Sequence, residues 1–488
     1  GRSEVLIPHL RALALGSDFT HSGARTLRLA RLFLDHLFKH LGAMGRPLQV
    51  FVQMDRFIRA YGARSLLLES LTSNPRAMDL LWHLFDGSRV LGEEIIRDPA
   101  LFDEVVSGTA LDAEIDTERV IGLVLDHPDA EAGWESLRRI KRGERFRIGI
   151  RYLESLDVEE EMLQQFSALA DLVVEAGLRL AERWMSGERE GEGALQIVAM
   201  GKWGGGEIGF GGDLDLIYVG AGAESTAEQR IAVQFGRGME GHSPMGRLFE
   251  LDPRLRPDGG DGPLVTNEEA LIRYFERRAQ NWERLAWTRA RRVVGTSPWH
   301  GFEELRHRLI RSGGWSAEWI GEIGEMRMRI ERERLRGEVD ASREFKSGPG
   351  GLLDLEFLGQ LATVRRACLG HQGTGAERLP SATLEMLDLA EADGWFADSA
   401  EAEFARRHYR HLRRCEQLLR IGDERSNSSL PADAEELLSL AMHLGFEKPD
   451  TFLRHHGEAR VRCREIFDRA MSAAAERAAG EAVAPQGD

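Results

Sequence analysis

The sequence predicts a mostly helical α+β protein, in which one small sheet lies between helical segments. Helix starts are marked at Asn74-Pro75 and Asp98-Pro99, where a capping side chain precedes a proline at the first helical position. Short β-prone apolar runs occupy residues 195–200 and 213–219, and both are bounded by glycines. After Asn267 the apolar residues return to helical spacing. Helices therefore dominate, and the strands are confined to the middle of the chain.

These changes of pattern divide the chain into four segments. We expect an N-terminal helical region over residues 1–145, a mixed α/β domain over 146–305, a C-terminal helical bundle over 306–475 and a flexible tail over 476–488. At 488 residues the chain is long enough for several domains that each bury a core of their own.

The composition excludes several classes of protein. A formal net charge of −16 argues against a nucleic-acid binder, because such proteins cluster cationic side chains. No apolar run approaches the roughly 20 residues of a membrane span. The three cysteines, Cys368, Cys415 and Cys463, are too far apart for a zinc ligand set. They indicate reduced thiols and a cytoplasmic protein, and the start Gly-Arg-Ser-Glu, without Met or a secretion signal, is compatible with a fragment.

A pair of carboxylates marks the most informative stretch of the chain. Asp213 and Asp215 are two residues apart within a predicted strand, so both side chains project from the same face. Asp252 ends the next predicted strand, over residues 247–252, and is the natural third acid. Three carboxylates suit Mg²⁺, which prefers oxygen ligands and can serve in phosphoryl displacement. The alternative is a solvated outer face of the sheet.

Glycines surround this pair of acids. Gly201, Gly205 and Gly212 leave room for backbone N–H groups to close around phosphate, and Lys202 can add a positive charge. Neither the Rossmann nor the Walker A spacing is present, and a simple turn is the alternative.

Four arginines are further candidates for phosphate contact. Arg254 and Arg256 share the strand parity of Asp252, so their guanidinium groups either face the predicted site or form surface ion pairs. Arg289 and Arg291 either reach a triphosphate or cap a helix end.

Other polar and aromatic residues favour structural roles. Trp282 is expected in the core, while Asp354 and Glu356 are expected to organise the start of a helix. His408 and His411 lie on an apolar helical stripe, which favours packing over a zinc site.

Four stretches resemble signatures of the glutamine synthetase adenylyltransferase family, and they occur in the family's order. Residues 197–217, which include GKWGGGEIGFGGDLDLI, resemble its nucleotidyltransferase signature, MGKLGG-x-EL-x-x-SSD-[IL]-DLI. The other three are LDPRLRPDGGDGPLV over 251–265, YFERRAQNWERLAWTRARRVVG over 274–295 and FKSGPGGLLDLEFLGQ over 345–360. The resemblance extends from roughly residue 50 to 470.

The resemblance implies a polymerase-β-like nucleotidyltransferase domain, over residues 146–305, between helical domains. It implies transfer of AMP from ATP to a tyrosine of glutamine synthetase with Mg²⁺, under control of a PII signal protein and glutamine. Asp213 and Asp215 would bind the metal, with Asp252 as a shared ligand or as the base for the tyrosine hydroxyl.

The length of the chain fits one half of a two-half family member. Residues 351–356 resemble the adenylylating half, whereas residues 262–264 and 282–284 resemble the half that removes AMP by phosphorolysis. We favour adenylylation. Gly211-Gly212 replaces the family's two serines and Pro253 follows Asp252, so a weakly active regulatory module is a further alternative.

Overall fold

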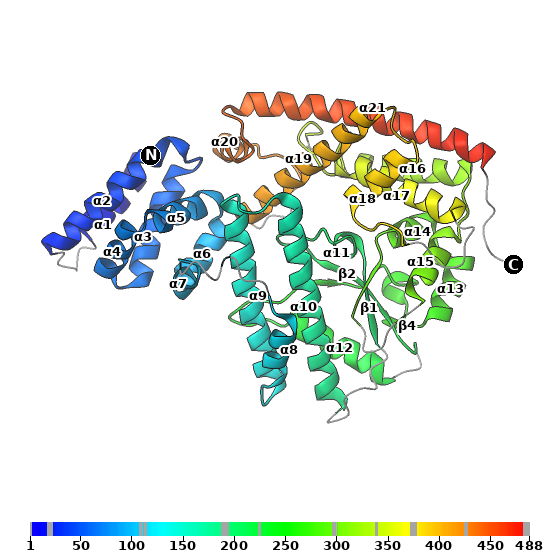
Figure 1. Ribbon diagram of the computed structural model, residues 1–488, viewed down its shortest axis with the longest axis horizontal. Coiled ribbons are helices and arrows are strands. Elements are labelled where there is room, and N and C mark those ends of the chain that lie inside the picture. The colour runs from blue at the N-terminus through cyan, green and yellow to red at the C-terminus, as the bar shows by residue number, and fades with distance from the viewer. Residues whose placement is uncertain are drawn as a thin grey trace. The chain divides into compact units, whose positions relative to one another are not determined.

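The fold is mostly helical with a small mixed sheet, as predicted for the α+β class (Figure 1). The computed structural model describes residues 2–16, 23–106, 111, 115–186, 195–222, 226–294, 299, 301–336, 340–370, 378–423 and 428–481. The last seven residues of the predicted tail lie outside these ranges.

The chain forms two compact units, each assembled from separate segments. Unit 1 contains residues 1–114, 143–162 and 414–455, and unit 2 contains residues 115–142, 163–413 and 456–488. The division falls inside four helices: α9 (Ala130–Leu153), α10 (Glu159–Ser186), α19 (Ser399–Asp423) and α21 (Pro449–Gly480). The division into four segments along the sequence stays a prediction.

Unit 1 is helical throughout its described residues. Its remaining elements are α1 (Arg2–Leu15), α2 (Ala24–His40), η1 (Leu41–Ala43), α3 (Pro47–Tyr61), α4 (Arg64–Ser73), α5 (Pro75–Gly87), α6 (Arg89–Arg97), α7 (Ala100–Val106) and α20 (Ala434–His443). The predicted helix start at Asn74-Pro75 is confirmed, because the Asn74 side chain accepts a hydrogen bond from the Ala77 N–H. Aromatic packing joins three of these helices, since the Phe57 ring contacts those of Phe85 and Phe102.

Unit 2 carries the sheet and the rest of the helices. Its helices are α8 (Thr117–Leu125), α11 (Gly201–Gly204), α12 (Thr226–Glu240), η2 (Gly259–Asp261), α13 (Glu268–Arg277), α14 (Asn281–Trp287), α15 (Phe302–Arg311), α16 (Ala317–Arg334), α17 (Leu352–Leu369) and α18 (Thr383–Ala392).

Five strands make up the sheet of unit 2 within the described residues. They are β1 (Gln196–Ala199), β2 (Leu214–Val219), β3 (Leu251–Asp252), β4 (Val265–Thr266) and β5 (Arg291–Val294). The strand order is β3-β2-β1-β5, and β4 also pairs with β2. β1 runs antiparallel to β2 and β5, whereas β2 runs parallel to β3 and β4. β3 thus ends the order, as expected of a strand followed by Pro253.

The structure corrects four predictions made from the sequence. The strand expected over residues 247–252 contains only Leu251 and Asp252. The helical spacing that begins after Asn267 was expected to continue past Arg289, but the chain forms β5 there, which holds the β-branched pair Val293-Val294. Trp282 is 38% exposed rather than buried, and Trp287 fills the core instead. α21 continues to Gly480, because its alanines are good helix formers, so the predicted tail begins as helix.

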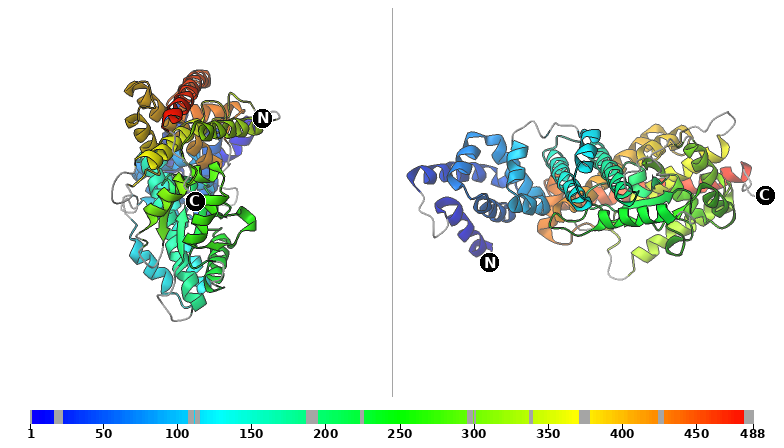
Figure 2. Two further views of the ribbon diagram at one scale, coloured as in Figure 1. Left: turned by 90° about the vertical axis from the view of Figure 1, so that its right-hand side faces the viewer. Right: turned by 90° about the horizontal axis from the view of Figure 1, so that it is seen from below.

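A buried ion-pair network holds the helical part of unit 2. Arg327 on α16 lies 2.6 Å from Asp354 on α17, and both side chains are fully buried. Arg464 on α21 pairs with Glu331 and lies 3.5 Å from Asp354, so α21 is tied to α16 and α17 (Figures 1 and 2). Asp354 also accepts a hydrogen bond from the Gly350 N–H, which confirms its role at the start of a helix.

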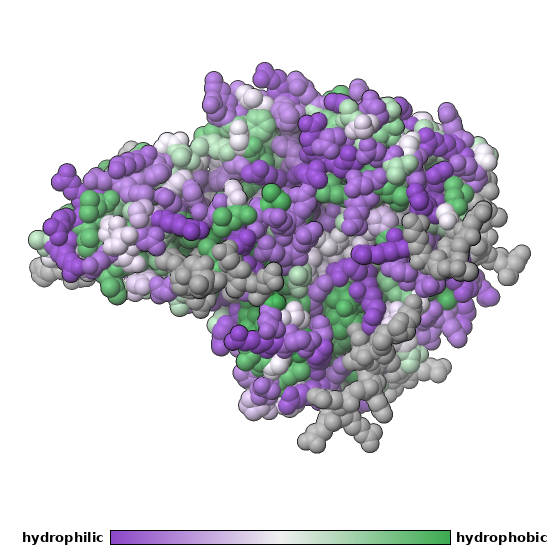
Figure 3. Space-filling view, viewed as in Figure 1, coloured by the Kyte–Doolittle hydropathy of each residue, from purple (hydrophilic) through white to green (hydrophobic). Residues whose placement is uncertain are grey.

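The view in Figure 3 presents mainly hydrophilic residues, with hydrophobic ones in small scattered groups. No described helix combines the length and the hydrophobicity that crossing a bilayer requires.

Candidate active site

The structure brings the three predicted carboxylates together at one end of β2 and β3. Asp215 lies directly opposite Asp252 in the parallel pairing of these strands, and Asp213 immediately precedes β2. One oxygen of each of the three side chains lies within 4.8 Å of the others. Side chains that are opposite in a parallel pair share a face of the sheet, as do residues two apart on one strand. The alternation therefore aims all three acids at one point.

The three carboxylates differ in their electrostatic surroundings. Burial, with the charges of Asp213 and Asp252, raises the pKa of Asp215 to about 7, although Arg254 and Lys346 oppose the shift. Hydrogen bonds from Arg254 lower the pKa of Asp252, against a smaller effect of burial. Asp213 is exposed, whereas Asp215 and Asp252 are half-buried. Negative charge is therefore least favourable on Asp215, and a nearby cation would favour its ionised form.

Of the arginines predicted to contact phosphate, Arg254 lies at the carboxylates. Its Nε donates to Asp252 Oδ1 at 2.8 Å and its Nη2 donates to Oδ2, while the side chain stays 79% exposed. Arg256 instead donates to the carbonyls of Pro253 and Gly260, because the chain turns after β3 and strand alternation ends there. Arg256 thus braces the turn in the structure, and its contact with phosphate stays a prediction.

Gly201 is the glycine that approaches the acids most closely. It follows β1 with a φ of +56°, and a Cβ placed there would overlap Oδ2 of Asp215. Both observations require glycine, since other residues rarely adopt positive φ and any side chain would displace the carboxylate. The Met200 N–H donates to the Asp215 carbonyl at 2.8 Å, which fixes this approach.

The other glycines of the turn serve several purposes. A Cβ at Gly205 would lie 2.9 Å from the Ser381 carbonyl and 3.1 Å from Arg289, so this glycine permits close packing on the helices. Gly212 packs on Ile208 immediately before Asp213. Lys202 is half-buried on α11. Contact of these residues with nucleotide stays a prediction.

A buried network around Glu207 anchors the glycine turn, and the sequence prediction did not include it. The Glu207 carboxylate pairs with Arg289 at 2.8 Å and accepts hydrogen bonds from Thr383 and from the Tyr409 hydroxyl at 3.1 Å. Arg413 donates to the Glu207 carbonyl. Burial acts to raise the pKa of Glu207, but Arg289 and Arg413 outweigh it, so the pKa is lowered. The available signal was an acidic residue within a glycine-rich turn.

Arg289 and Arg291 are both engaged by groups of the protein. Arg289 is buried against Glu207. Arg291 forms a two-pronged pair with Asp171 of α10, at 2.8 and 3.0 Å, and donates to the carbonyls of Trp203 and Gly204 at the end of α11. Of the two predicted roles, these contacts correspond to helix capping for Arg291.

The residues predicted to have structural roles contact other groups of the protein. Glu356 is buried, with Arg289 3.9 Å away. His408 is buried and stacked on Phe404, and its Nε2 lies 3.0 Å from the Gly350 carbonyl, so its packing role is confirmed. His411 faces another ring, that of His456.

The donor set of the three carboxylates fits Mg²⁺. Each acid offers an oxygen within reach of one ion, and hard divalent cations prefer oxygen ligands. A cation would also relieve the repulsion that raises the pKa of Asp215. The group stands at an exposed edge, where water and substrate oxygens can complete the coordination.

Two family models match the chain. Residues 78–305, which include the carboxylates and the glycine turn, match the model of the glutamate-ammonia ligase adenylyltransferases. Residues 324–471 match the GlnD PII-uridylyltransferase model. The chain is homologous to the glutamine synthetase adenylyltransferases. This relation confirms the resemblance that the four signatures indicated.

Individual relatives extend the match over almost the whole chain. Bifunctional glutamine synthetase adenylyltransferase/adenylyl-removing enzymes are 26% identical in Neisseria meningitidis serogroup B, over 95% of this chain and 50% of the relative, and 27% identical in Mycobacterium tuberculosis, over 93% and 47%. The Brucella melitensis enzyme is 30% identical over 82% of this chain and 42% of its own length. The chain thus spans about half the length of these relatives.

The close approach of Gly201 to Asp215 gives a first prediction. We expect Gly201→Ala to weaken Mn²⁺ binding by about 10-fold or more, because the added methyl displaces a ligand. Gly206→Ala is the matched control, since Gly206 also has a positive φ, +70°, but open space around it. Mn²⁺ titration followed by electron paramagnetic resonance measures both variants. Equal affinities in the two variants would contradict the assignment of Asp215 as a ligand.

The Glu207 network gives a second prediction. Glu207→Gln leaves Arg289 buried without its nearest counter-charge, so we expect the free energy of unfolding to fall by about 3–5 kcal/mol. Glu269→Gln removes an exposed pair with Arg273 and should cost at most about 0.5 kcal/mol. Denaturant unfolding of both variants makes the comparison. A loss at Glu207 no larger than the loss at Glu269 would show that the network does not hold the turn.

Proposed function

We propose that the chain transfers AMP from ATP to a tyrosine hydroxyl of glutamine synthetase. The observation that carries this proposal is the meeting of Asp213, Asp215 and Asp252 at one end of β2 and β3, inside the segment that matches the adenylyltransferase model. The relatives' names supply the substrate protein, since they act on glutamine synthetase.

We infer that the sheet of unit 2 and the helices on it form a polymerase-β-like nucleotidyltransferase domain. Two features support this inference. An Asp-x-Asp pair opens β2 after a glycine turn, and the third acid lies on the adjacent strand β3. The family resemblance supplies the name of the fold.

The reaction would exchange one phosphorus–oxygen bond for another. The tyrosine oxygen bonds to the α-phosphorus of ATP, the bond from that phosphorus to the bridging oxygen breaks, and pyrophosphate leaves. Asp213 and Asp215 would hold Mg²⁺, which when bound stabilises the charge of the phosphate oxygens. Asp252, kept deprotonated by Arg254, would share the ion or accept the hydroxyl proton.

Arg254 and the glycine turn would position the nucleotide. The Arg254 side chain is mostly exposed, so it can leave Asp252 and pair with phosphate oxygens as substrate enters. Gly201, Gly205 and Gly212 would admit the triphosphate close to the backbone, and Lys202 would add a positive charge. Arg256 would contribute indirectly, because it holds the turn after β3 in place.

The first alternative is the removal of AMP from the tyrosine by phosphorolysis. An oxygen of inorganic phosphate would bond to the α-phosphorus of tyrosine-bound AMP, and the bond from that phosphorus to the tyrosine oxygen would break. The products would be ADP and the tyrosine, whose oxygen regains its proton. The relatives are named for both activities, and the chain spans half of their length. The second alternative, a weakly active regulatory module, rests on Gly211-Gly212 and Pro253.

We propose a PII signal protein and glutamine as regulators that act through the C-terminal helices. The support is the match of residues 324–471 to the GlnD PII-uridylyltransferase model. Both are added to the assay below as effectors, and their effect is measured on the rate of transfer.

The test of the proposal is a pair of reactions with the purified chain. The first contains unmodified glutamine synthetase, Mg²⁺ and ATP labelled at the α-phosphate, and the second contains adenylylated glutamine synthetase with inorganic phosphate. We expect label on glutamine synthetase in the first reaction. ADP release only in the second would assign phosphorolysis, and no signal in either would favour the regulatory module.

Asp213→Asn and Asp215→Asn connect this activity to the site. Each variant should lose at least about 100-fold in rate, the loss typical of removing one group that stabilises the transition state. The fold should be retained, because each change relieves repulsion between carboxylates. Asp261→Asn, which removes an exposed acid of the same unit, is the matched control and should keep its rate. Normal turnover in either variant would overturn the site assignment.

A further inference from the structure

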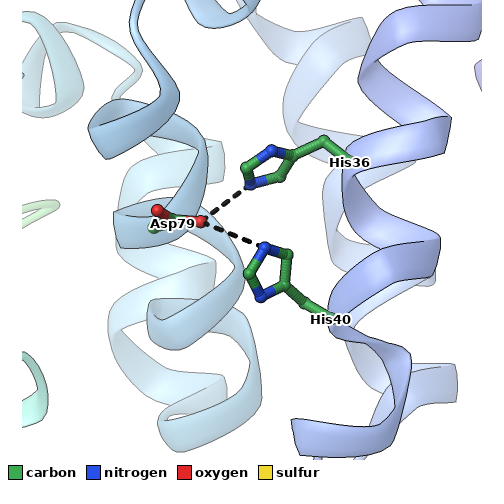
Figure 4. Close-up of side chains that lie close together, drawn as sticks. All are labelled: His36, His40 and Asp79. Carbon is green, nitrogen blue, oxygen red and sulfur yellow. Dashed lines mark hydrogen bonds and ion pairs between the residues drawn. The ribbon is translucent and has the colours of Figure 1, made fainter.

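Unit 1 contains a second group of potential metal ligands, which lies outside the carboxylate site. His36 and His40 on α2 and Asp79 on α5 each offer a ligand atom, and these three atoms lie within 4.8 Å of one another. Figure 4 shows both imidazole rings turned toward the Asp79 carboxylate. Within the described residues, this group and the three aspartates are the two clusters of metal-ligand side chains at such distances.

We propose that His36, His40 and Asp79 bind Zn²⁺ and thereby join α2 to α5. The two histidines are four residues apart on one helix, so their side chains lie on the same face and can share an ion. Two imidazoles and one carboxylate are a donor set that Zn²⁺ accepts, with water as a fourth ligand.

The distances fit an ion between the three groups. Nε2 of His36 lies 2.7 Å from Asp79 Oδ1, and Nε2 of His40 lies 3.9 Å from the same oxygen. The first distance is a hydrogen bond, but the second is too long for one. Ligand atoms of tetrahedral zinc are roughly 3.3 Å apart, given metal–ligand bonds of about 2.0–2.1 Å. Small rotations of the side chains would lengthen the His36–Asp79 distance and shorten the His40–Asp79 distance, so that both match the spacing of zinc ligands.

The surroundings of the group suit a site that exchanges its ion with solvent. The side chains of His36, His40 and Asp79 are 19%, 37% and 36% exposed, so an ion can enter and water can complete its coordination. Trp82 stacks on His40 with ring centroids 5.5 Å apart and donates from its indole N–H to Asp79 at 3.2 Å. Trp82 thereby orients two of the three ligands, as outer groups commonly do around metals.

Other histidines of unit 1 provide a comparison. His83 pairs with Glu154 at 2.6 Å and His9 pairs with Asp55 at 2.7 Å, but each of these carboxylates faces one imidazole in the described contacts. Those pairs are ordinary hydrogen bonds. The convergence of two imidazoles on one carboxylate oxygen sets Asp79 apart.

The experiment compares Zn²⁺ binding by the untagged full chain and by three variants. Equilibrium dialysis in excess Mg²⁺, which occupies the aspartate site, gives the zinc stoichiometry, and Co²⁺ absorption in the visible range reports the coordination geometry. We expect the wild-type chain to bind one more equivalent of Zn²⁺ than His36→Gln or His40→Gln, each of which should bind at this site at least about 100-fold more weakly. His83→Gln is the matched control and should bind like the wild type.

Two results would overturn the proposal. One is unchanged zinc stoichiometry in His40→Gln, and the other is an equal loss in His83→Gln. If His36→Gln does not fold because it loses the hydrogen bond to Asp79, His40→Gln provides the test. The wild-type His40 side chain makes no hydrogen bond to Asp79 that this substitution could break. The thermal midpoint of the metal-free variants checks folding, and a rise of this midpoint with Zn²⁺ in the wild type alone supports the link between α2 and α5.

Discussion

Repulsion between carboxylates is the constraint around which unit 2 is built. The parallel pairing of β2 and β3 forces Asp215 beside Asp252, and Asp213 joins them from the residue before β2. Three negative charges so close together favour separation of the strands. The surrounding structure holds them through the strand hydrogen bonds, the narrow approach of Gly201 and the counter-charge of Arg254. The sheet therefore keeps three mutually repelling carboxylates close together, and this repulsion favours the binding of a cation.

The position of the glycine turn depends in turn on the helices of the same unit. Glu207 extends from the turn into a buried set of partners on α18 and α19, and Arg289 completes the set from the segment before β5. A buried charge is tolerated only where its partners surround it. The turn thus has one favourable position, and the helices are as much a part of the site as the strands.

The sequence indicated for two reasons that the three acids lie together. Strand periodicity places Asp213 and Asp215 on one face, and the ordered signatures identified Asp252. Long-range contacts were beyond such rules. Nothing local to Glu207 indicates that Thr383 and Tyr409 would surround it, and nothing local to Trp282 shows that its helix turns that ring outward. β5 was missed because the helical spacing continues up to Arg289 and gives no sign that α14 ends at Trp287 and that a strand follows. Gly211 was noted as a lost hydroxyl, yet its φ of +61° gives glycine a backbone reason at that position.

Arg254 gives the site a resident counter-ion. Its guanidinium lies on Asp252 within the chain itself, and its side chain extends into solvent. The three carboxylates therefore have a positive charge at hand whether or not an ion is present in the surrounding medium. The neutralisation of Asp252 is therefore built into the chain, and an ion or phosphate that binds here meets a tethered positive charge as well as the anions.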